Sequence, residues 1–287
     1  MLPVIYKKPH LEIQAADIFN IASKDGLVRI EEMKTRAFFA ENTLFYGLGL
    51  LMAYALKHHY SRATGDDLDW ILSPTASLIA AFTGIHFEKE AFTGFVSRES
   101  AIIIAPACSG VNFLISAFSL LVIALTHNLV GAGRKLLGIG ISAATAFILT
   151  VCVNALRIIT SIFLYRADIY GGWTTPERIH RIDGTLIYFF SLLLIYPTAC
   201  WIGKRLGSRK KGETMVPVRR KGSITPILWA GAAPFFCYLA LTIGVPILNQ
   251  AWRNPKFVEH AFMVVGGSSL MLLLFCLIVL GRRRINR

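Results

Sequence analysis

The chain has 287 residues, of which 54% are hydrophobic and only 16% are charged. An ordinary soluble domain carries about a quarter charged residues, so this composition excludes a typical water-soluble enzyme, and the dominance of apolar residues also excludes a disordered chain. The formal net charge is +13, which in a soluble protein would suggest a nucleic-acid partner. In membrane proteins the same excess gathers in cytoplasmic loops. We therefore expect an all-α polytopic membrane protein embedded in a lipid bilayer.

Six apolar segments are candidates for membrane-spanning helices, which need roughly 20 mostly apolar residues. In chain order, the first of them being short, they are Asn42–Leu56, Asn112–Leu129, Leu136–Leu156, Thr185–Ile202, Ile224–Leu248 and Ala261–Leu280. A seventh apolar stretch, Leu68–Ile85, contains Asp69 and Pro74. It could span, but these two residues favour an interfacial or re-entrant segment.

Basic residues in short loops set the orientation of the spans. The range Lys204–Lys221 is strongly basic, and the C-terminal tail adds Arg282, Arg283, Arg284 and Arg287. We expect both to be cytoplasmic, which puts Arg166–Gly184 and the segment before Asn112 outside. If Leu68–Ile85 crossed, the basic N-terminal arm would lie outside as well. The charge rule therefore favours six spans with both termini in the cytoplasm, and nucleic acid is not needed to explain the charge.

The same pattern predicts four parts of the chain. Residues 1–41 form a charged cytoplasmic N-terminal arm without the pattern of a signal peptide, and residues 42–204 form the membrane-embedded core. Residues 205–223 form a basic cytoplasmic linker, and residues 224–287 form a two-helix hairpin with a basic tail.

Arg157 is the clearest charged residue at membrane depth, where charge costs several kcal/mol unless it is partnered. It follows Lys135 by 22 residues, about 33 Å of helix, which places it near the outer boundary. Asn154 lies on the same helix face. The alternative interpretation is an arginine that extends its side chain to the outer headgroups.

Cys108 differs from the other four cysteines, which lie in apolar stretches and form no CxxC pair. It sits between Pro106 and Ser109, two residue types that begin helices, and just before the apolar run from Asn112. A thiol at a helix N-terminus is favoured as the nucleophilic thiolate. A packed structural cysteine is the alternative.

His180 lies in the predicted outer loop, four residues before Gly184. On a continuing helix, the bare backbone of Gly184 would let a neighbour approach closely. A solvated loop histidine is the alternative. The predicted topology brings His180, Cys108 and Arg157 to the outer ends of three spans. A thiol, an imidazole and a fixed cation form a workable acyl-transfer set.

Three short motifs follow one another along the chain: Pro106-Ala-Cys-Ser-Gly-Val-Asn112, Asn154-Ala-Leu-Arg-Ile158 and His180-Arg-Ile-Asp-Gly184. In sequence and in order they resemble the exosortase/archaeosortase family of multi-pass membrane transpeptidases, and they are most similar to its small branch called exosortase K. The resemblance covers about Leu68–Lys204, including a Leu-x-Pro-Thr-Ala run. The N-terminal arm and the C-terminal hairpin match nothing in it.

The resemblance implies a nucleophile at Cys108, an essential arginine at Arg157 and an acid/base histidine at His180. Supporting roles fall to Asn154, Ser109, Gly110, Asn112 and Gly184. The family cuts C-terminal sorting signals made of a short motif, a transmembrane helix and a basic tail. The implied partners are membrane proteins with such signals, cut at the extracytoplasmic face of the inner membrane without a metal or other cofactor. Hydrolysis and transpeptidation pass through the same thioester, so the motifs leave both open.

Two other classes of function stay open. In a transporter or lipid-handling protein, Arg157 would bind an anionic group. In a non-catalytic assembly subunit, the three residues would matter only for stability. A serine protease is disfavoured because no Gly-x-Ser-x-Gly pattern is present with a suitable histidine. The predicted outer loops offer no His/Asp/Glu cluster at the spacing of metal ligands.

Overall fold

The computed structural model describes residues 42–167, 170–172, 174–208 and 225–285. The chain divides into two compact units, and the elements below belong to the second, Phe45–Arg287. Residues 45–60 are helical. They are followed by α2 (Asp69–Thr83), β1 (Glu88–Glu90), β2 (Gly94–Ser97), β3 (Ile102–Ile104), a 3₁₀ turn (Pro106–Cys108), α3 (Val111–Thr126), α4 (Ala132–Arg166), α5 (Pro176–Ser208), α6 (Thr225–Leu239), a π-helical turn (Ala240–Gly244), α7 (Val245–Leu248), a 3₁₀ turn (Ala251–Arg253) and α8 (Pro255–Ile285).

The predicted N-terminal arm, residues 1–41, and residues 209–223 of the predicted linker lie outside the described residues. Residues 205–208, which the linker prediction also included, are the last turn of α5.

The all-α polytopic class predicted from the sequence is confirmed. In the described part of the chain, the helices long and apolar enough to cross a membrane are Pro106–Thr126, Ala132–Arg166, Pro176–Leu206, Ala230–Leu248 and Pro255–Val279. The segment predicted as the first span, residues 42–56, is also helical but is not among these five.

α3 is the most enclosed of these helices. In its most apolar window 78% of the residues are buried, against 11% for α8. A helix that is apolar on all sides belongs inside a protein or against lipid. α3 fills the interior, whereas α4 and α8 leave large apolar side chains such as Ile148, Phe163 and Leu274 exposed on the surface. An exposed apolar surface on long helices is what a lipid environment requires.

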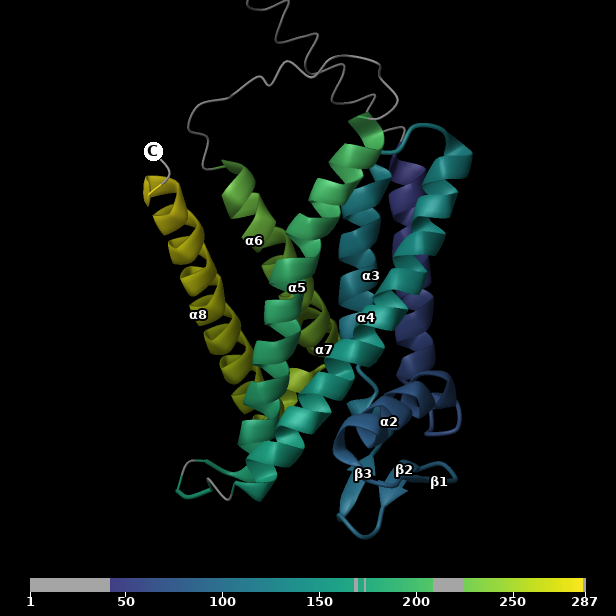
Figure 1. Ribbon diagram of the computed structural model, residues 1–287, viewed down its shortest axis with the longest axis vertical. Coiled ribbons are helices and arrows are strands. Elements are labelled where there is room, and N and C mark those ends of the chain that lie inside the picture. The colour runs from purple at the N-terminus through teal and green to yellow at the C-terminus, as the bar shows by residue number, and fades with distance from the viewer. Residues whose placement is uncertain (1–41, 168–169, 173, 209–224, 286–287) are drawn as a thin grey trace, which may run out of the picture. The chain divides into compact units, whose positions relative to one another are not determined.

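α2 and a small antiparallel sheet lie at one end of α3 and α4, where α2 packs against α4 (Figure 1). With 15 residues, α2 is about 22 Å long, which is shorter than the hydrocarbon core of a bilayer. The sheet, in the order β1-β2-β3, is an addition that the sequence reading did not include. Gly94, at φ +118°, starts β2 because a Cβ there would collide with the carbonyl oxygen of Ile104.

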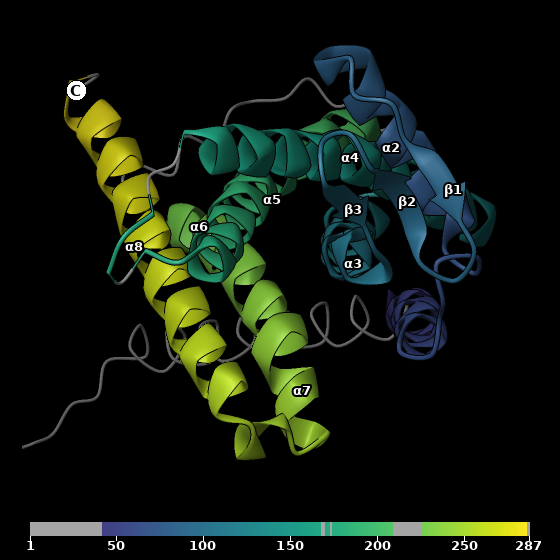
Figure 2. The same ribbon diagram turned by 90° about the horizontal axis from the view of Figure 1, so that it is seen from below.

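Because neighbouring helices run antiparallel, the ends of three of them lie at the same end of the molecule. α3 begins, α4 ends and α5 begins at the end of the molecule that carries the sheet (Figure 1). Seen from that end, β3 lies beside α3 and α4 (Figure 2). The basic residues at the start of α4 and the end of α5, Arg134, Lys135, Lys204 and Arg205, belong to the opposite end.

Candidate active site

Cys108 ends the 3₁₀ turn that connects β3 to α3, so the predicted position just before a helix N-terminus is what the structure has. The carbonyl oxygen of Cys108 accepts a hydrogen bond of 2.6 Å from Nδ2 of Asn154 on α4. Gly110, at φ +74°, makes this contact possible, since a Cβ there would lie only 3.0 Å from the amide carbon of Asn154. Asn154 and Gly110 therefore fix the backbone that carries the thiol.

Arg157 is buried, with 8% of its surface exposed, and its partners are protein groups. It donates to the hydroxyl of Tyr188 across 3.3 Å, and its guanidinium carbon lies 5.3 Å from the centre of the Tyr188 ring. The Tyr188 hydroxyl in turn donates to Oδ1 of Asn154 across 2.6 Å. α4 continues nine residues beyond Arg157, to Arg166. An arginine that reaches out to the headgroups is therefore not what the structure has.

His180 lies on a helix and not in a loop, because α5 begins nine residues earlier than the predicted span. Pro176 suits the first helical position, and the Thr175 hydroxyl accepts a hydrogen bond of 3.3 Å from the backbone N–H of Arg178. These two residues are start signals that the loop interpretation did not use. The helical start holds the imidazole against α4.

Both nitrogens of the His180 ring are engaged. Arg157 donates to Nε2 across 2.6 Å, and since a guanidinium can only donate, Nε2 must accept and the ring hydrogen is on Nδ1. Nδ1 lies 3.0 Å from the hydroxyl oxygen of Ser161, and that hydroxyl donates to Oδ2 of Asp183 across 2.8 Å. The network thus runs from Asp183 through Ser161 and His180 to Arg157.

Gly184 allows this network to form, but the group it accommodates is Arg157. A Cβ on Gly184 would lie 2.7 Å from Nε of Arg157 and 3.4 Å from its guanidinium carbon. The sequence reading predicted a close approach at this glycine, beneath the imidazole of His180.

Two of the predicted supporting residues lie apart from the Arg157–His180 pair. Asn112, in the first turn of α3, accepts a hydrogen bond of 2.6 Å from the ammonium group of Lys57. Ser109 is fully buried beside Cys108. Both belong to the loop that carries the thiol, and neither contacts the imidazole by a hydrogen bond in the described part of the chain.

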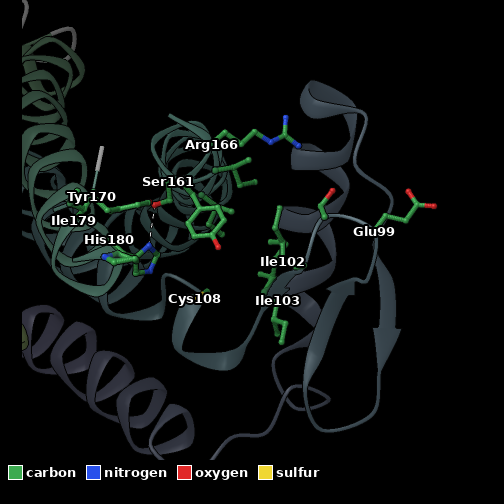
Figure 3. A pocket seen from close by; sticks show the side chains of 16 residues that line it. Glu99, Ile102, Ile103, Cys108, Ser161, Arg166, Tyr170, Ile179 and His180 are labelled. Atoms are coloured by element: carbon green, nitrogen blue, oxygen red, sulfur yellow. Dashed lines mark hydrogen bonds between the residues drawn. The ribbon is translucent and has the colours of Figure 1, made fainter. Parts of the chain in front are cut away.

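A cavity of about 550 Å³ joins the thiol to the imidazole. Cys108, Ser161 and His180 line it, and Figure 3 shows them on the side opposite Ile102 and Ile103. Arg157 is not among its lining residues, but its guanidinium is hydrogen-bonded to the imidazole of His180, which is one of them.

Sequence reasoning missed Ser161, Asp183 and Tyr188. Ser161 follows Arg157 by four residues and Asp183 follows His180 by three, so helical spacing would have placed each beside its partner. Tyr188 gave no comparable signal, because a tyrosine in an apolar span is ordinary.

The fold and the site define a polytopic membrane protein in which a thiol and an imidazole share one cavity and a buried arginine holds the imidazole. The chain belongs to the transmembrane exosortase family, whose sequence model matches residues 42–197, more than half of its length. No curated protein and no solved structure matches the chain. At the level of the family, membership supports a membrane protein-sorting transpeptidase. The matched region ends within α5, so the hairpin of α6–α8 lies outside it.

Proposed function

We propose that the protein is a membrane cysteine endopeptidase or transpeptidase that cleaves C-terminal sorting signals through a thioester on Cys108. One observation carries the proposal: Cys108 and His180 line the same cavity, while Arg157 is hydrogen-bonded to the imidazole. Family membership supports the substrate class, membrane proteins whose signal is a short motif, a transmembrane helix and a basic tail.

The first half-reaction forms the thioester. The hydrogen bond from Arg157 to Nε2 of His180 breaks, Nε2 takes the proton of the Cys108 thiol, and the sulfur attacks the carbonyl carbon of the scissile peptide bond. The tetrahedral intermediate collapses as the C–N bond breaks, and Nε2 returns the proton to the leaving amine. The amine departs with the C-terminal helix and tail, and the rest of the substrate stays on sulfur.

Arg157 interacts with His180 before the proton transfer and with the substrate after it. Once Nε2 carries a proton, it can no longer accept from the guanidinium, and the two cations repel each other. The freed N–H donors of Arg157 then become available to the oxyanion that develops on the carbonyl oxygen. Nε of Arg157 is buried without a hydrogen-bond partner among the described residues, which leaves a further donor for this purpose.

Ser161 and Asp183 support the imidazole on its other side. Nδ1–H donates to Ser161, whose hydroxyl donates to the carboxylate of Asp183. The negative charge of Asp183 is therefore connected to the Nδ1 side of the imidazole. This arrangement holds one tautomer and stabilises the imidazolium while it exists, as a third group does in serine and cysteine hydrolases. We class both as positioning residues.

The second half-reaction releases the substrate. A nucleophile, either water or an acceptor amine, attacks the thioester carbonyl, the C–S bond breaks, and the thiolate is regenerated. Both nucleophiles lose one proton on the way, which Nε2 of His180 accepts and Cys108 finally regains. Hydrolysis and transpeptidation therefore use the same residues and differ only in the acceptor.

We place the site at the extracytoplasmic face of the inner membrane, with both termini in the cytoplasm. The basic ends of α4 and α5 support this orientation, because Arg134, Lys135, Lys204 and Arg205 are at the end of the molecule opposite Cys108. In this arrangement residues 42–204 are the catalytic core, and residues 224–287 are a hairpin docked on it. The ion pair of Arg178 with Glu259, at 2.5 Å, supports the docking.

A transporter that uses Arg157 to bind an anionic group is disfavoured. Such a group would have to displace protein partners, because two of the guanidinium nitrogens are engaged by His180 and Tyr188.

The proposal is tested by mass spectrometry of co-expressed candidate membrane proteins, each carrying a motif, a transmembrane helix and a basic tail. The wild-type protein should shorten the C-terminus of at least one candidate, and Cys108→Ala should leave it intact. Cys152→Ala is the matched control, because Cys152 is an exposed thiol on α4 outside the site, and it should process normally. Processing by Cys108→Ala would overturn the proposal.

A further inference from the structure

β3 is an edge strand that meets the cavity. In the sheet order β1-β2-β3, β3 pairs with β2 on one side, and no strand in the described ranges pairs with its other side. The register is antiparallel, with Ile102 opposite Ser97 and Ile104 opposite Phe95. An unpaired edge presents backbone N–H and C=O groups that can accept another extended segment.

The edge is turned toward the reacting groups. All three residues of β3, Ile102 to Ile104, line the same cavity as Cys108 and His180. Successive side chains of a strand point to opposite faces, so three strand residues in a row can line one cavity only if the strand presents its backbone edge to it. One wall of the site is therefore extended backbone.

The strand also leads to the nucleophile. Ile104 ends β3, and Cys108 follows four residues later at the end of the 3₁₀ turn. A segment that lay along β3 would thus run toward Cys108. β3 has three residues, or about 10 Å of strand, which matches about three residues of a bound peptide.

The rest of the lining can receive side chains. It includes Ile158 and Ile162 of α4 and Ile179 of α5, together with Glu99 and Arg166. Ile158 and Ile162 are 6% and 7% exposed, so they are fixed parts of the protein interior. A wall of this kind fits apolar side chains.

We propose that the substrate binds by strand addition: the segment just before the scissile bond pairs with the free edge of β3 as a fourth strand. Its alternate side chains, which are apolar, then face Ile158, Ile162 and Ile179. In this mode main-chain hydrogen bonds give affinity and the wall gives specificity. The inference rests on the proposed function, because it names how that same site recognises its substrate.

Disulfide trapping tests the pairing. The substrate is the co-expressed membrane protein that the wild-type enzyme shortens, held uncut by the Cys108→Ala background. Single cysteines are placed at successive positions before its cleavage point and oxidised against Ile103→Cys in β3. Paired strands bring opposite Cβ atoms to about 4.5–5.5 Å, close to disulfide range, on one face only. The cross-link should form at one substrate position, the one opposite Ile103, and be lost at the positions on either side of it.

Two variants make the pattern decisive. Ile102→Cys points to the other face of the sheet, so its cross-link should move to the neighbouring substrate position. Glu88→Cys lies on β1, at the opposite edge of the sheet, and should cross-link none. Cross-links at several successive positions, the same position for both β3 variants, or no cross-link to either would overturn strand addition. A substrate that Cys108→Ala still cuts would instead overturn the proposed function, so the two failures are distinguishable.

Discussion

Arg157 on α4 and His180 on α5 are joined by a hydrogen bond of 2.6 Å between Nη2 and Nε2. The contact depends on Gly184, whose missing side chain leaves room for the guanidinium. It fixes which ring nitrogen accepts, because arginine can only donate. It also places a fixed positive charge beside the group that must carry a proton during the reaction.

Replacing Arg157 by lysine should abolish processing although the charge is kept. The planar guanidinium binds His180 and Tyr188 at the same time. The ammonium group of lysine is a single compact charge on a side chain of different length, so it cannot make both contacts. We expect a loss of about 100-fold or more, the order of magnitude for a misplaced catalytic group. The measurement is the rate of shortening of the co-expressed substrate. Near-normal processing would show that charge alone suffices.

His180→Ala and Gly184→Leu should fail for different reasons. His180→Ala removes the acid, whereas Gly184→Leu displaces Arg157 by bulk, since even a Cβ would lie 2.7 Å from its Nε. An activated ester substrate has a leaving group of low basicity that needs less protonation. It should therefore partly rescue His180→Ala and leave Gly184→Leu defective. Rescue of both variants, or of neither, would remove the acid role from His180.

The fold class could be predicted from the sequence, and so could the position of Cys108, Arg157 and His180 near the ends of three long helices, because both depend on local signals. Long apolar runs define spans, and Lys and Arg at their ends define direction. Arg157 was identifiable because charge within an apolar run is costly. The start of α5 at Pro176 and the sheet of β1–β3 were missed. Strands of three or four residues are too short to show a clear alternation of polar and apolar residues, so the sequence does not distinguish them from loops.

The contacts within the site could be predicted only in part. Gly184 was expected to admit a neighbour, but which neighbour depends on how α4 packs against α5, and that is a tertiary relationship. The cavity wall at Ile102–Ile104 depends on the same packing. Sequence spacing places residues on one face of one element and does not say which element faces them.

Ser161→Ala and Asp183→Asn should slow processing without removing it. Ser161 makes one hydrogen bond to the imidazole, and a bond of about 1 kcal/mol corresponds to roughly a fivefold change in rate. Asp183→Asn removes the negative charge that the Ser161 hydroxyl donates to, and we expect it to lower the rate about 10- to 100-fold. Ser161→Thr keeps the hydroxyl and should restore most of the rate. The measurement is the pH dependence of the processing rate. Loss of a positioning residue should shift this profile, whereas a purely structural defect would lower the rate without shifting it.

The orientation of the chain can be tested with reporters. A fluorescent protein fused after Lys211 should be fluorescent and alkaline phosphatase at the same point inactive, because the basic linker is expected in the cytoplasm. A phosphatase fused after Tyr170, between α4 and α5, should be active instead. The reverse pattern would put Cys108 on the cytoplasmic side and contradict the proposed location of the site.

The central claim is that Cys108 carries the substrate as a thioester. The most direct measurement is intact-protein mass spectrometry of the membrane fraction from cells that hold the enzyme and a processed substrate, with and without hydroxylamine. We predict an adduct on Cys108 whose mass equals the N-terminal product less one water, which hydroxylamine removes and which Cys108→Ala never forms. Substrate that is shortened at full rate with no adduct on Cys108, or with the adduct on another residue, would contradict the account.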